Sequence, residues 1–231
     1  MPHQSKNSNQ LGALIREIVF GMEDGMVSTL GSISGIAVGS QDKFVVLLSG
    51  IVIIAVESIS MGIGSYLSNR SKLEVEMRMI KEEKRAIEKY LPREKKELEE
   101  FYLADGWPPE LARKMADTAA QDKKLMLKEM SYRELALVPD REGRPLLNAA
   151  AMYFSYIAGG TVPLLAYFFL PVMTALPVSI VTTLIGLFGI GIFVAHYTKL
   201  SRWKSGLRIM LVGGLAFVIG LIVGEVFNKF Y

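Results

Sequence analysis

Charge is distributed very unevenly along this 231-residue chain. Residues 70–145 hold 18 of the 26 Lys and Arg residues and 17 of the 23 Asp and Glu residues, which leaves 8 basic and 6 acidic side chains elsewhere. The rest of the chain consists largely of apolar stretches close to the ~20 residues that a helix needs to cross a bilayer. We therefore expect an integral membrane protein, and a purely soluble enzyme is excluded.

Five apolar stretches are long enough to span a membrane, and all should be helices because lipid cannot hydrogen-bond an unpaired backbone. They cover residues 18–40, 44–68, 147–171, 175–197 and 207–228. The sequence thus predicts an all-α membrane protein of five transmembrane helices, with a small helical domain inserted between the second and the third. The expected domains are residues 1–69, 70–145 and 146–231.

The inserted domain is rich in strong helix formers and has two clear breaks. The second span should run on into the charged segment until Pro92, where another helix starts and continues to Asp105-Gly106. A further helical stretch, one helix or two, follows Pro109. A domain this small and charged has little room for a large core of its own.

The short loops carry their basic residues mainly on one side of the membrane. The residues on that side are Lys6, Arg16, Arg70, Lys72, Lys199, Arg202, Lys204 and Arg208, against Lys43 and Lys229 opposite. Because loops rich in Lys and Arg stay in the cytoplasm, we expect the N-terminus and residues 70–145 to be cytoplasmic. A prokaryotic cell membrane is favoured over a vacuolar membrane because the chain is compact and has no long leader.

Several classes of chemistry are excluded by residue types that are missing. The sequence has no Cys, which excludes disulfides, thiolate zinc sites and cysteine nucleophiles, and only His3 and His196 supply imidazole. It also has no Gly-rich phosphate-binding loop. A net charge of +3 gives no argument for nucleic acid. We therefore expect neither an enzyme nor a catalytic cofactor.

Acidic residues interrupt the first two expected spans. Glu23 and Asp24 lie in the first, and Glu57 lies near the middle of the second. A carboxylate deep in a bilayer costs about 2.5–3.5 kcal/mol on insertion scales, so such residues usually face a bundle interior and mark ion or proton pathways. Asp24 and Glu57 are the candidate ligands, since Glu23 lies nearer the interface. Met61 shares a helix face with Glu57, and this donor pair suits Fe(II) or Mn(II).

The inserted domain offers a second group of candidate metal ligands. They are Glu83, Glu94, Glu97, Met130 and Glu134, spaced so that adjoining helices can bring them together. The lysines interleaved with them also fit a solvated Lys/Glu surface. Composition alone favours that second interpretation.

Three motifs lie in the expected spans: DGMVSTLGSISG in the first, SISMGIGSYLSNRS in the second and GGTVPLLAYFF in the third. In the inserted domain, PREKKELEEFY and MSYRELALVPD follow in order. Together these segments resemble the vacuolar iron transporter family and its prokaryotic relatives. The resemblance covers nearly the whole chain.

The resemblance implies five-span subunits that form a homodimer, a metal path at the subunit interface, and export of ferrous iron from the cytosol in exchange for protons. By motif position it places Asp24 and Met61 on the path. It assigns to a cytoplasmic metal-binding domain the residues Glu83, Glu94, Glu97, Met130 and Glu134. Ala86 and Ser131 depart from the family pattern, in which a glutamate and a second methionine are common, and this implies a weaker capture site or an altered metal preference.

The expected function is therefore a metal/proton antiporter for Fe(II), with Mn(II) as a second substrate. Protonation of Asp24 or Glu57 from the opposite side would weaken their affinity for the cation and couple its release to proton entry. A membrane-anchored di-iron oxidase would need histidine ligands, and no His lies between His3 and His196. The alternative is a membrane-anchored metal sensor or assembly protein that does not transport.

Overall fold

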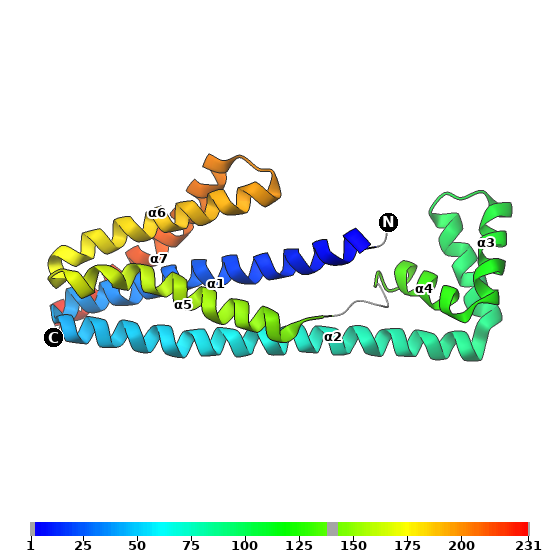
Figure 1. Ribbon diagram of the computed structural model, residues 1–231, viewed down its shortest axis with the longest axis horizontal. Helices are drawn as coiled ribbons and strands as arrows, with labels where there is room; N and C mark the ends of the chain where they lie inside the picture. Colours follow the sequence, from blue (N-terminus) through cyan, green and yellow to red (C-terminus); the bar gives the residue numbers. More distant parts are fainter. Residues whose placement is uncertain (1–2, 138–142, 231) are drawn as a thin grey trace. The chain divides into compact units, whose positions relative to one another are not determined.

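The computed structural model describes residues 3–137 and 143–230, and every regular element in these ranges is an α-helix (Figure 1). The helices are α1 (His3–Ser40), α2 (Lys43–Ala104), α3 (Pro109–Gln121), α4 (Lys123–Arg133), α5 (Pro145–Phe169), α6 (Val172–Thr198) and α7 (Arg202–Phe230). They form two compact units, and α2 contributes to both. The first unit contains Met1–Leu67 and Arg144–Tyr231, and the second contains Ser68–Gly143. The prediction of an all-α protein is confirmed.

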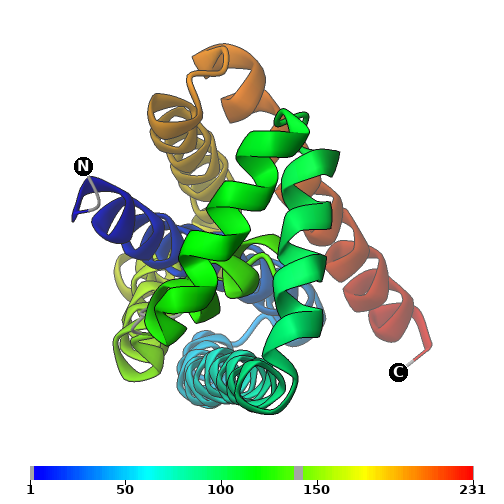
Figure 2. The same cartoon turned by 90° about the vertical axis from the view of Figure 1, so that its right-hand side faces the viewer.

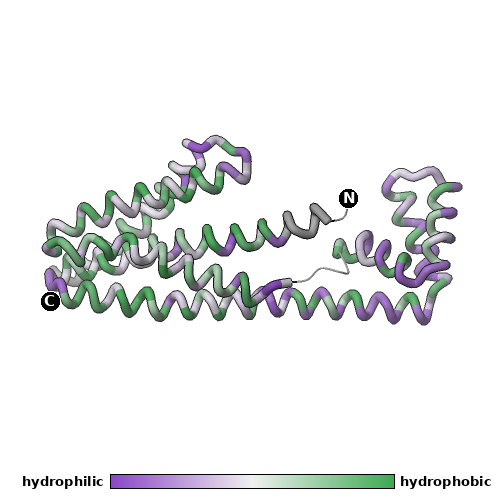
Figure 3. The backbone as a smooth tube through the Cα atoms, in the orientation of Figure 1, coloured by the Kyte–Doolittle hydropathy of each residue, from purple (hydrophilic) through white to green (hydrophobic). Residues whose placement is uncertain are grey.

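Four helices in the described part of the chain are long and apolar enough to cross a membrane, namely α2, α5, α6 and α7. Figure 3 shows that α2 changes along its length from mainly hydrophobic to mainly hydrophilic residues. With 38 residues, α1 is long enough for a fifth span. α1 is less hydrophobic than α5, α6 and α7 because it contains Glu23, Asp24 and many Ser and Gly residues. The count of five spans therefore stays a prediction.

The position of α1 explains why it tolerates so many polar residues. It packs against α5, α6 and α7 in the interior of the first unit. Leu30, Ile33 and Ala37 on α1 are fully buried, and so is the hydroxyl-bearing Thr29. Because neighbouring helices rather than lipid surround much of α1, it needs less apolar surface than a lipid-facing span.

Glycines bring α1 and α7 into direct backbone contact. A Cβ atom added at Gly220 would overlap the carbonyl oxygen of Gly31, and one at Gly224 would overlap the backbone of Gly35. Small residues at such positions let membrane helices approach closely and gain van der Waals contact. These four glycines therefore allow α1 and α7 of one chain to pack backbone against backbone.

Within the second unit, α2 bends. The backbone of Tyr90 is non-helical (φ −132°, ψ 38°), two residues before Pro92, so the predicted helix break is present. After α2, Gly106 adopts φ +90°, which favours glycine at this turn. The segment that follows forms two helices because Asp122 interrupts it. The Asp122 Oδ1 atom accepts a hydrogen bond from the backbone N–H of Lys124 at 2.8 Å and caps α4.

A small apolar core holds α2, α3 and α4 together in the second unit. Its side chains are almost completely buried: Ile87, Leu98, Tyr102, Ala112, Ala116, Ala119, Met126 and Met130. Lys95 also donates a hydrogen bond to Asp117 at 2.7 Å, which links α2 to α3. Figure 2 shows α3 and the last segment of α2 side by side. This core fixes the directions of the acidic side chains around it.

We expect Gly220→Ala to destabilise the protein by about 1–3 kcal/mol, the usual cost of overpacking, because the new Cβ atom meets the backbone of Gly31. Gly64→Ala is the matched control, since a Cβ atom there has nothing within 4 Å and Ala is the better helix former. Thermal unfolding in detergent measures both variants. Equal melting temperatures for Gly220→Ala and the parent would contradict the close α1–α7 contact.

Candidate metal-binding sites

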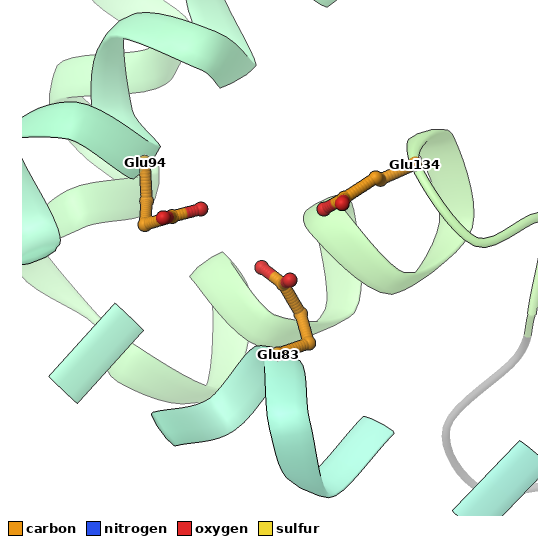
Figure 4. A group of neighbouring side chains, drawn as sticks. All are labelled: Glu83, Glu94 and Glu134. Carbon is orange, nitrogen blue, oxygen red and sulfur yellow. The ribbon is translucent and has the colours of Figure 1, made fainter. Parts of the chain in front are cut away.

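Three carboxylates from separate parts of the chain meet in the second unit. Glu83 lies before the bend of α2, Glu94 lies after it, and Glu134 is the C-terminal cap residue of α4. One carboxylate oxygen of each lies within 4.8 Å of the others. Figure 4 shows the three side chains directed toward a common space. On a straight helix Glu83 and Glu94 would be about 16 Å apart along the axis, so the bend at Tyr90 is what brings them together.

Two of these three carboxylates are withdrawn from solvent. Glu83 is 7% exposed and Glu94 is 6% exposed, whereas Glu134 is exposed. The Oε1 atom of Glu83 is buried and has no hydrogen-bond partner among the described residues. A buried carboxylate oxygen without a partner is costly. A divalent cation between the three groups would satisfy it, because such ions are bound by several carboxylate oxygens at once.

Burial and mutual repulsion raise the pKa values in this cluster. The pKa of Glu83 is raised to about 8, first by burial and then by the charges of Glu134, Glu94 and Glu97. The pKa of Glu94 is also raised, first by burial and then by Glu97 and Glu134, and Arg93 opposes this shift. Without a cation the cluster therefore holds a proton at neutral pH. A cation that binds must displace that proton.

The candidate ligands predicted in the inserted domain take different places. Glu83, Glu94 and Glu134 form the carboxylate trio, as described above. Glu97 is half-buried, and its charge acts on both Glu83 and Glu94. Met130 is fully buried in the apolar core, where methionines commonly serve packing. That all five bind metal stays a prediction.

A second polar network holds the end of α4 against the end of α2. Arg133, the residue before Glu134, forms ion pairs with Asp105 and Glu129 and lies 4.3 Å from the centre of the Tyr102 ring. Tyr102 in turn donates a hydrogen bond to Glu129 at 3.2 Å. These contacts fix the position of Glu134. The sequence analysis missed this network, although the spacing of Glu129 and Arg133 places them on one helix face.

In the first unit, the predicted ligands lie on α1 and α2. Asp24 is half-buried on α1, and Met61 is half-buried on α2. The charge of Glu57 acts on the carboxylate of Asp24. Glu57 itself is exposed on the surface of the single chain. The expectation that membrane carboxylates face a bundle interior is therefore not met by Glu57 within one chain.

Two hydrogen-bonded groups on α1 were not found from the sequence. Glu17 is 4% exposed and accepts a hydrogen bond from Ser65 of α2 at 3.0 Å. Ser28, one turn after Asp24, is hydrogen-bonded to Tyr156 of α5 at 2.6 Å. Glu17 lies seven residues before Asp24, and this helical spacing is the signal that could have found it. The pair Ser28–Tyr156 has no such signal, because its members are 128 residues apart.

Comparison with known proteins adds independent information. A family model described as the VIT family matches residues 15–225. Vacuolar iron transporter 1 of Eucalyptus grandis is 29% identical over 206 residues, which is 89% of this chain and 83% of that protein. Vacuolar iron transporter 1 of Arabidopsis thaliana is 27% identical over 98% of this chain and 91% of that protein. The vacuolar iron transporter of Plasmodium falciparum is 26% identical over 93% of this chain and 82% of that protein.

We predict that binding of a divalent cation releases roughly one proton per site at pH 6.5 and much less at pH 9, because the pKa of Glu83 is raised to about 8. Titration calorimetry of the full chain with Mn(II), in buffers of different ionisation enthalpy, counts the protons. The raised pKa of Glu83 also makes the stability of the cation-free protein depend on pH. Since this pKa lies above the unfolded value of 4.5, the cation-free protein loses stability as pH rises from about 4.5 to 8.

The matched control for this titration is Glu82→Gln. Glu82 neighbours Glu83 in sequence, but its side chain is 60% exposed and pairs with Arg78. Glu83→Gln should lose the pH-dependent proton release, and Glu82→Gln should keep it. Equal proton release from both variants would show that Glu83 is not the group that titrates.

Proposed function

The chain belongs to the VIT family, and we propose that it carries Fe(II), with Mn(II) as a second substrate, out of the cytosol in exchange for protons. The relatives named above are transporters rather than enzymes. One observation carries the proposal. It is the carboxylate trio around the unpartnered oxygen of Glu83, in a chain that has four candidate membrane spans among its described residues.

In this proposal the second unit captures the cation. Glu83, Glu94 and Glu134 supply carboxylate oxygens, Glu97 adds negative charge, and the buried Met130 supplies a thioether. Without a cation the trio holds one proton and carries a charge of about −2, and a divalent cation that displaces this proton leaves the site at about −1. The role of the unit is to raise the local supply of the ion rather than to form the barrier to its passage.

Ala86 and Ser131 add no carboxylate to the cation site of the second unit. Ala86 has no donor atom, and Ser131 has only a neutral hydroxyl, which is buried and has no hydrogen-bond partner among the described residues. Carboxylates are the stronger ligands for a divalent cation. We therefore propose a single cation at this site, held more weakly than a site with a fourth carboxylate in contact would hold it.

The path through the membrane is proposed to use the ligands of the first unit. The charges of Asp24 and Glu57 act on each other, and in this proposal the two carboxylates bind the cation together. Met61 lies four residues after Glu57 and supplies the softer donor that Fe(II) accepts. A proton that reaches either carboxylate from the far side neutralises it and lowers its affinity for the cation. Release of the ion is thereby coupled to inward proton movement.

The exposure of Glu57 supports the proposal of a homodimer. An outward-facing carboxylate in a span costs several kcal/mol if lipid covers it. A second copy of the chain would remove that cost by placing Glu57 at a subunit interface, next to the cation path. Close two-fold packing of this kind is the common arrangement of identical subunits.

The proposed topology has five spans, with α1 as the first. Its polar residues are acceptable because α5, α6 and α7 pack around it. The asymmetry of Lys and Arg in the loops supports a cytoplasmic N-terminus and a cytoplasmic domain over residues 70–145, between spans two and three. The relatives are named for the vacuole, and we propose a prokaryotic cell membrane for this chain. In both membranes the captured ion leaves the cytosol.

We predict that Asp105→Cys and Ser201→Cys react with an impermeant thiol reagent only from the cytoplasm, and that Ser40→Cys reacts from outside. All three positions are exposed, and the chain has no native Cys, so each label reports a single site. Labelling is compared in intact cells and in inverted vesicles. Reaction of position 105 from outside intact cells would contradict the orientation.

We predict that Asp24→Asn lowers metal-coupled proton movement by about tenfold or more while the fold is preserved, because Asn keeps an oxygen donor but neither binds a proton nor carries charge. Proteoliposomes that report Fe(II) entry and internal pH together measure this. Glu23→Gln, at the adjacent position, is the control and should remain close to the parent. Parent-like uptake and proton flow in Asp24→Asn would refute this path. A parent that binds Fe(II) without carrying it would favour an anchored metal sensor.

A further inference from the structure

The turn of α1 that carries Asp24 is in backbone contact with α5. A Cβ atom added at Gly25 would overlap the carbonyl oxygen of Tyr156, and one at Gly159 would overlap the carbonyl oxygen of Met22. Glycine at these positions is what allows two helices to approach so closely. Asp24 therefore sits on a segment whose distance from α5 is fixed by main-chain atoms on both sides of it.

A hydrogen-bonded chain adds a polar link to this contact. The Ser28 hydroxyl donates to the backbone carbonyl of Asp24 at 2.7 Å. Because a serine hydroxyl has a single proton, the 2.6 Å contact between Ser28 and Tyr156 must have Tyr156 as the donor. The order is therefore Tyr156 to Ser28 to the carbonyl of Asp24. The chain therefore ties the backbone of α1 at Asp24 to a side chain of α5.

Tyr156 is shielded from solvent. The residue is fully buried, so no bulk solvent reaches the Ser28 hydroxyl from the side of α5. The charges of both Asp24 and Glu57 act on the Tyr156 hydroxyl. Its proton is directed to Ser28, so it does not neutralise either of them.

We propose that Tyr156 is a positioning residue for metal translocation, which fixes through Ser28 the turn of α1 that presents Asp24. This inference rests on the proposed role of Asp24 in transport. Tyr156 touches neither the cation nor its ligand oxygens in this role. It determines where the backbone of Asp24 lies and therefore where the carboxylate can meet the ion.

Uptake of Fe(II) by proteoliposomes containing the full chain tests the inference. Tyr156→Phe keeps the buried ring and removes only the hydroxyl. We expect the KM for Fe(II) to rise about fivefold and the maximal rate to stay within about twofold of the parent, because a displaced ligand weakens binding of the ion. Ser28→Ala removes the bond from Tyr156 and also the bond to the Asp24 carbonyl, so it should raise the KM at least as much. It also carries the test if Tyr156→Phe does not fold.

Tyr167→Phe is the matched control. Tyr167 is fully buried on the same helix, and its hydroxyl has no hydrogen-bond partner among the described residues. Its removal should leave the KM unchanged. The double variant Tyr156→Phe with Ser28→Ala should be no worse than Ser28→Ala alone, because Ser28→Ala already removes both the bond from Tyr156 and the bond to the Asp24 carbonyl.

The outcomes separate this inference from the function on which it rests. No Fe(II) uptake by the parent would refute the proposed function. Uptake by the parent, with the KM of Tyr156→Phe equal to that of Tyr167→Phe, would refute only the positioning role. A lower maximal rate at unchanged KM would also refute it, because that result shows a loss of active protein alone. Additive effects in the double variant would show that Tyr156 and Ser28 act separately.

Discussion

Lipid offers no hydrogen bonds to a polar group, and the arrangement of the first unit depends on that constraint. The backbone N–H and C=O groups of each span must be hydrogen-bonded within their own helix, so the spans can differ only in their side chains. A helix with as many hydroxyl and carboxyl groups as α1 is acceptable where other helices surround it, and α5, α6 and α7 do so. Glycines on α1 make this possible because they let its neighbours approach to main-chain contact. α1 is thus less apolar than α5, α6 and α7, the helices that surround it.

In the second unit, burial of carboxylates also costs free energy. Water is available there, yet the small apolar core draws Glu83 and Glu94 inside and leaves one oxygen of Glu83 without a partner. Burial and repulsion together raise the pKa of Glu83 to about 8. A site built in this way is unfavourable when empty and ionised, so it gains from either a proton or a cation. Arg133 pairs with Asp105 and Glu129 rather than with the trio, where the charge of Arg93 acts on Glu94.

Features carried by local sequence could be predicted, and features set by contacts between distant segments could not. Apolar length gave the helices of four candidate spans, and Pro92 marked the bend of α2. Helical spacing made Glu83, Glu94 and Glu134 candidates and the family resemblance assigned them to a metal site, but neither showed that the bend would turn them toward one another. Hydropathy alone does not identify α1 as a span, since the place of α1 in the bundle depends on its packing against α5 and α7. The link between Ser28 and Tyr156 joins positions 128 residues apart, and no periodicity reports such a pair.

Two acids on one face of α1, the buried Glu17 and the half-buried Asp24, show how the kind of partner decides the use of a carboxylate. Glu17 accepts a hydrogen bond from Arg16 at 2.9 Å and another from Ser65, so its charge is compensated within the chain. In the described part of the chain, no basic side chain forms an ion pair with Asp24 or Glu57. A permanent basic partner would occupy the oxygen atoms that a cation needs. Neutral hydroxyls such as those of Ser28 and Tyr156 can hold the helix in place and leave the negative charge available. For an acid that must bind and release a cation, positioning by hydroxyl groups is therefore the better arrangement.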